Sequence, residues 1–193
     1  MRATLAIALR NFRPSRRENW LLNVALAFIA LALFVSMGAD RWTMFLLAAL
    51  PLAAAATAAT LHIRSTWLFA IPLYGRQLAR ACALNAIAYG LAAPALVLTG
   101  EVVFRHAASL DTIVWVLAGS SVAALVGLSA TLRDGLVRAA YIVGGGLSGF
   151  AIASLASAGI PWFGTLAFAV LLGFVALRAF GETLARYDPI PEA

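Results

Sequence analysis

The chain has few charged residues and few of the side chains that most catalytic sites use. Only 11% of its 193 residues are charged, against ~25% in an ordinary soluble domain, and 63% are hydrophobic. It contains no lysine, two histidines and one cysteine. An intramolecular disulfide is therefore excluded, and we interpret Cys82 as a small buried hydrophobe. This composition excludes an ordinary soluble domain and predicts a membrane protein.

The motifs of several catalytic classes are also missing. The chain has no His-Glu-x-x-His pair for zinc and no glycine-rich loop with Lys and Ser or Thr for nucleotide phosphates. Gly146-Leu147-Ser148-Gly149 is similar to the serine motif of rhomboid-type proteases, but His62 and His106 lie at or beyond the ends of other spans. Asp134-Gly135 begins like a CDP-alcohol phosphotransferase signature without its downstream aspartates. We predict no catalytic residue and no metal site, and an intramembrane enzyme using Ser148 is the third-ranked hypothesis.

Long stretches without a charged residue make up most of the sequence. Arg138 and Arg178 bracket 39 residues with no charged side chain and no histidine. One helix of that length would measure about 58 Å, nearly twice the ~30 Å hydrocarbon core of a bilayer, so we expect the chain to reverse at Gly159-Ile160-Pro161-Trp162. Similar windows predict an all-α polytopic membrane protein, a single transmembrane domain over 1–193. Its six helices are expected at about 19–39, 42–61, 81–100, 112–132, 139–158 and 161–178, the last two being the shortest.

The arginines are distributed unevenly between the two sides of this predicted domain. Twelve of the fourteen fall in the N-terminal segment, the loops after the second and fourth spans, and the tail, whereas only Arg41 and Arg105 fall on the other side. Because arginine in short loops resists translocation, we expect a multi-pass protein of the inner (plasma) membrane with both termini and the 179–193 tail in the cytoplasm. Contact with anionic lipid headgroups explains the +6 charge, and nucleic-acid binding is not expected.

Two segments on the predicted cytoplasmic side are too short to cross. Residues 1–13 form an imperfect amphipathic pattern that ends at Pro14, and it predicts an N-terminal elbow over 1–18 along the inner leaflet; a poorly ordered basic tail is the alternative. Between spans two and three, Trp67, Leu68 and Ile71 lie on one helical face, and Pro72 breaks that helix. We expect an ordered interfacial helix there, and its aromatic residues make it a candidate docking surface; a plain interfacial helix without a partner is the alternative.

Small residues recur at helical spacing within the predicted spans. Gly119 and Gly127 are eight residues apart in span four, and Gly145 and Gly149 are four apart in span five. Lipid tails are as apolar as leucine, so membrane helices associate through close backbone contact at small residues. We predict these four glycines to be helix-packing positions, within the subunit or between subunits. Pro94 in span three is expected to bend its helix, as is Pro51 in span two.

The layout and the stretch WLFAIPLYGRQLARACAL from Trp67 resemble an ABC-2 type transporter permease, the membrane subunit of an ABC exporter. The resemblance implies a coupling helix that docks on a separate ABC-type ATPase, which would bind ATP and Mg²⁺; no cofactor is expected in this chain. It also implies a second permease subunit, in a homo- or heterodimer. Unlike many relatives, this chain has Arg64-Ser65-Thr66 where they have an acidic run. The residues assigned to coupling are Ser65, Trp67, Leu68, Ile71, Pro72, Arg76 and Gln77.

The function expected from this resemblance is export by alternating access. A cleft rich in Ala, Gly, Phe and Trp, with a few polar residues, fits a hydrophobic or amphipathic substrate. The polar residues expected to line it are Asn23, Asn85, Ser120 and Ser121. The alternative is a non-transporting membrane scaffold or immunity-type protein that packs against other membrane proteins through its small residues.

Overall fold

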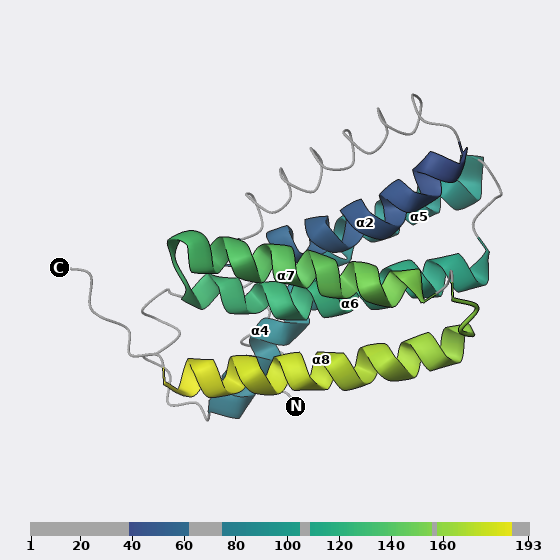
Figure 1. Cartoon of the computed structure of the whole chain (residues 1–193). Coiled ribbons are helices and arrows are strands. Elements are labelled where there is room, and N and C mark those ends of the chain that lie inside the picture. Colours follow the sequence, from purple (N-terminus) through teal and green to yellow (C-terminus); the bar gives the residue numbers. More distant parts are fainter. Residues whose placement is uncertain (1–38, 62–74, 105–108, 156–157, 187–193) are drawn as a thin grey trace.

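The structure is a computed structural model that describes residues 39–61, 75–104, 109–155 and 158–186. Within these ranges the chain is helical apart from short turns, and it contains no strand (Figure 1). The predicted elbow 1–18, the first span and the interfacial segment up to residue 74 lie outside the described residues. The elements are α2 (Ala39–Ala58), α4 (Gly75–Gly90), α5 (Ala92–Phe104), α6 (Leu110–Leu128), the short 3₁₀ helix η1 (Ser129–Leu132), α7 (Gly135–Ser154) and α8 (Trp162–Ala185).

Four helical segments are long enough and apolar enough to cross a membrane, which indicates a membrane protein. They are Gln77–Val103, which joins α4 and α5, Leu110–Leu132, Gly135–Ser154 and Trp162–Ala185. They correspond to the predicted third to sixth spans. The helix α2 covers most of the predicted second span, with a shorter apolar stretch at Leu46–Ala58.

The prediction that the last two spans are the shortest is wrong for the sixth span, whereas the fifth, Gly135–Ser154, is the shortest of the four membrane-length segments. The helix α8 has 24 residues and is the longest unbroken helix in the described ranges, and α7 has 20. The sixth span is predicted to end at 178 because Arg178 is its first charged residue. In the structure α8 continues to Ala185, and Arg178 Nε donates to Glu182 Oε1 at 3.1 Å, one turn further along the same helix. Charge marks where a helix leaves the apolar layer, not where its hydrogen bonding stops.

The predicted reversal between the last two helices is confirmed. The helix α7 ends at Ser154 and α8 begins at Trp162, and the two helices run in opposite directions (Figure 1). Gly159 has φ of +72°, a left-handed conformation that favours glycine, and Pro161 caps the start of α8.

Pro94 interrupts the third predicted span. Its ring has no N–H to donate to the carbonyl of Gly90 and crowds that carbonyl. The helix breaks at Leu91 into α4 and α5, although Leu91 N still donates to Ile87 O at 2.9 Å. As a result α5 runs beside α2, whereas α4 packs against both α2 and α8 (Figure 1). By contrast, α2 is unbroken at Pro51.

The helix α6 occupies the centre of the bundle, and α2, α4, α7 and α8 all pack against it (Figure 1). Its two faces differ. One face carries Gly119, Ala123 and Gly127 against α2 and α7, and the other carries Val122 and Leu125 toward α8. The small face lets the backbones of α2, α6 and α7 approach closely.

One end of the bundle is rich in arginine, and we call it the basic end. Here α2, α6 and α8 finish and α4 and α7 begin: Arg138 Nη2 donates to Ala59 O at 3.0 Å, and Gly181 lies against Ala79. The arginines with described side chains all belong to helix ends or links at this end and are exposed, namely Arg80, Arg133, Arg138, Arg178 and Arg186. Five of the twelve arginines expected on one side therefore lie together at this end.

Candidate functional site

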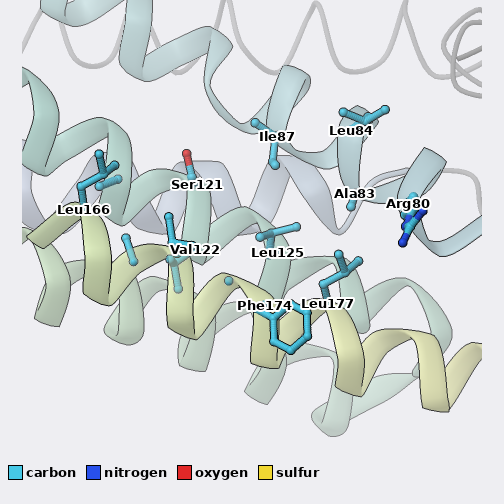
Figure 2. A pocket seen from close by; sticks show the side chains of 14 residues that line it. Arg80, Ala83, Leu84, Ile87, Ser121, Val122, Leu125, Leu166, Phe174 and Leu177 are labelled. Carbon is cyan, nitrogen blue, oxygen red and sulfur yellow. The ribbon is translucent and has the colours of Figure 1, made fainter. Parts of the chain in front are cut away.

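A large apolar groove lies between α4, α6 and α8, with a volume of about 1190 Å³ (Figure 2). One wall comes from α4, where the lining positions follow the three- and four-residue spacing of a single helical face. These positions are Arg80, Ala83, Leu84 and Ile87. This wall is one continuous stripe over two turns of helix, with the arginine at its N-terminal end.

The other two walls come from α6 and α8. The helix α6 contributes Ala118, Ser121, Val122 and Leu125. The helix α8 contributes Leu166, Ala169, Val170, Gly173, Phe174 and Leu177. Gly173 allows α8 to approach α6 closely, because a Cβ at this position would lie only 3.2 Å from Leu125 Cδ1. The groove therefore exists where α8 touches α6 through small residues and diverges from α4.

Among the fourteen lining residues, only Arg80 and Ser121 are polar. The Ser121 hydroxyl donates to Leu117 O at 2.7 Å in its own helix, so this donor is already satisfied. Arg80 is exposed at the end of the groove, as Figure 2 shows. Such a lining can hold apolar groups along its length and an anionic group at one end, but it offers no pair of groups for acid–base or nucleophilic chemistry.

Of the polar residues that the sequence predicted to line a cleft, only some line the groove. Ser121 lines the groove, whereas Asn85 and Ser120 are buried and do not line it. Asn23 lies outside the described residues. Glu101, which the sequence places at the end of its span, is buried in α5 with 6% of its surface exposed. Within the described ranges, no three His, Cys, Asp or Glu side chains are grouped so that they could hold a metal.

Most of the predicted coupling residues lie outside the described ranges. These are Ser65, Trp67, Leu68, Ile71 and Pro72. Arg76 and Gln77 fall in the first turn of α4, and Gln77 is half-buried. In the sequence, the predicted interfacial segment is followed directly by α4, the helix that forms one wall of the groove.

The four glycines predicted for helix packing lie at one junction of α2, α6 and α7, on the side of α6 away from the groove. Gly119 and Gly149 face each other across α6 and α7, since a Cβ on either would meet the carbonyl of the other. Gly127 lies against the backbone of Ala55 in α2. A Cβ on Gly145 would lie 2.9 Å from Ala123 O and 3.0 Å from Ala55 Cβ. All these contacts are within one subunit.

The groove itself was not predicted from the sequence, and neither was the place of Arg80 in it. The signal that could have shown Arg80 is its position at the head of the stripe Ala83, Leu84 and Ile87, at spacings of three, four and seven residues. The walls from α6 and α8 have no such signal, because both helices are apolar on nearly every face.

Comparison of the chain with protein-family models, curated proteins and solved structures found no match.

Proposed function

We propose that this chain is the membrane subunit of an ATP-driven exporter whose ATPase is a separate chain, as its resemblance to ABC-2 permeases implies. In this proposal the groove between α4, α6 and α8 receives a hydrophobic or amphipathic substrate. The basic end faces the cytoplasm, in line with the distribution of arginine, and a second permease subunit completes the pathway.

One observation carries the proposal: α4 connects the predicted coupling segment directly to the groove. The helix begins at Gly75, right after that segment, and its face at Arg80, Ala83 and Ile87 forms a wall of the groove. At its other end, the break at Leu91 separates α4 from α5. A push on the segment from a docked ATPase would move α4 as a lever and change the width of the groove.

The test is to replace Trp67–Ile71 with Ser and Gly in a tagged chain and to purify it from native membranes. We expect the unmodified chain to bring down an ATP-hydrolysing partner, and the altered chain to insert normally but lose that partner. The matched control is Leu136→Ser with Val137→Ser, which changes two exposed apolar residues at the basic end outside the segment. The control should retain the partner.

Two results would contradict the proposal. Retention of the ATPase by the Trp67–Ile71 variant would remove the role of the segment. The absence of any ATPase from the unmodified preparation would favour the alternative of a non-transporting scaffold.

A further inference from the structure

The groove between α4, α6 and α8 differs in chemistry at its two ends. Figure 2 shows Arg80 and Leu177 toward one end and Leu166 toward the other. Arg80 and Leu177 belong to the basic end, because Gly181 of α8 lies against Ala79 of α4 there. The groove therefore has a cation at one end and apolar walls along the rest of its length. This arrangement is complementary to a lipid that has an anionic headgroup at one end and an apolar chain.

The length of the groove also matches one leaflet of a bilayer. Leu166 and Leu177 are eleven residues apart on α8, which corresponds to about 16 Å along the helix. That is about half of the ~30 Å hydrocarbon core. A groove that starts at the headgroup level and stops near the midplane fits the acyl chain of a lipid from the leaflet on its own side.

Selectivity for such a lipid has to come from the charge. Acyl chains of any lipid would fill an apolar groove about equally well, because the walls and the lipid tails have the same chemistry. Arg178, next to Leu177, is paired with Glu182 at 3.1 Å. Arg80 carries the only charge among the lining residues, and it is exposed where a headgroup would lie.

We propose that the groove binds one anionic phospholipid of the leaflet at the basic end, with an acyl chain between α4, α6 and α8 and the phosphate at Arg80. This inference rests on the proposed function, since it names the class of amphipathic molecule that the exporter groove takes. Arginine at a membrane surface attracts anionic lipid with a strength of about 1 kcal/mol, which corresponds to a preference of about fivefold over a zwitterionic lipid.

The test is native mass spectrometry of the full chain in detergent, titrated with dioleoyl phosphatidylglycerol or dioleoyl phosphatidylcholine. We expect the first phosphatidylglycerol to bind about fivefold more tightly than phosphatidylcholine. In Arg80→Gln this preference should disappear while phosphatidylcholine binding is unchanged. The control is Arg186→Gln, an exposed arginine at the same end that does not line the groove, and it should keep the preference.

A second variant tests the groove rather than the charge. Ser121→Phe places a ring in the lining of α6 and should weaken the binding of both lipids by fivefold or more. Leu147→Phe also introduces a phenyl ring, on an exposed face of α7 outside the groove, and should leave binding unchanged. A preference that persists in Arg80→Gln, or unchanged affinity in Ser121→Phe, would overturn the proposal. The assay contains no ATPase, so the failure of the exporter proposal, seen as loss of a partner, is distinguishable from failure here.

Discussion

Gly149 shows how closely single residues determine the approach of three helices. A Cβ built on this residue would lie 2.6 Å from Pro51 Cβ and 2.8 Å from Ala123 Cβ, and it would also meet the carbonyl of Gly119. Two of these three contacts involve backbone or the rigid proline ring, so neither helix can yield by a rotamer change. A Cβ on Gly144, which belongs to the same helix, would have no such neighbour within 4 Å.

We predict that Gly149→Ala destabilises the protein by about 2 kcal/mol, because overpacking a close contact typically costs 1–3 kcal/mol. The matched change Gly144→Ala should cause no loss and should add up to about 1 kcal/mol through helix propensity. The free energy of unfolding in mixed detergent micelles measures both. Equal effects of the two substitutions would show that the junction of α2, α6 and α7 is not packed as described.

Two arginines at the basic end make contacts of different kinds. Arg138 donates to the carbonyl of Ala59 at 3.0 Å, which satisfies an acceptor just beyond the end of α2 and links two helices. Arg178 pairs with Glu182 within one helix, and both side chains are more than half exposed. An exposed pair of that kind contributes roughly 0.3–0.5 kcal/mol. Arg138 therefore adds a polar contact between α2 and α7 at the basic end, and Arg178 serves mainly to continue α8.

The helix α8 is attached to the bundle by one narrow stripe. Its buried residues are Thr165, Ala169, Gly173, Phe180 and Leu184, and most of its other side chains are exposed. In a bilayer those exposed apolar side chains face lipid or another subunit. Phe180 is fully buried and packs in the main core cluster with Leu78 of α4 and Leu132 of η1, so it holds α8 at the basic end of the groove.

We predict that Phe180→Ala lowers the free energy of unfolding by about 3 kcal/mol, because removal of a large buried side chain leaves a cavity. Phe168→Ala is the matched control on the same helix, since Phe168 is 48% exposed, and it should change stability by no more than about 0.5 kcal/mol. Chemical denaturation of the purified variants measures the difference. A small effect of Phe180→Ala would mean that α8 is held elsewhere.

The existence of these helices could be predicted from the sequence, but their ends could not. In an apolar environment the backbone N–H and C=O groups of an uncharged stretch must bond to one another, which a helix achieves. The predicted third to sixth spans therefore each have a helical counterpart in the structure. The ends differ because helices continue through polar residues: α4 begins at Gly75, before Arg80, and α8 continues past Arg178. The break at Leu91 could be expected from Pro94, because that residue acts locally.

The groove could not be predicted because it depends on which helix faces meet. The position of Gly119 and Gly127 at spacings of four residues from Ala123 indicated a packing face on α6, but not that α2 and α7 would take it. Because α2 and α7 pack on that face, α8 and the groove lie on the opposite face of α6, which carries Val122 and Leu125. That outcome follows from tertiary contacts between nearly uniform apolar helices, which periodicity does not distinguish.

At the scale of the whole molecule, the two ends of the bundle differ in charge. The basic end carries the exposed arginines of α4, α7 and α8, whereas the opposite end has the turn between α7 and α8, with Ala158 and Gly159 exposed. Short arginine-bearing links are retained in the cytoplasm during insertion. The turn at Gly159 is therefore expected on the external side.

We predict that Ala158→Cys reacts with a membrane-impermeant maleimide added to intact cells and that Leu136→Cys does not react until the membrane is permeabilised. Both residues are exposed, Leu136 at 89%, so a difference in labelling reports their sides of the membrane rather than burial. The native Cys82 is 1% exposed, so the parent chain should remain unlabelled and serves as the background control. External labelling of Leu136→Cys would place the basic end outside. The predicted coupling segment and the end of the groove at Arg80 would then face away from any cytoplasmic ATPase, and the proposed exporter could not be driven from that side.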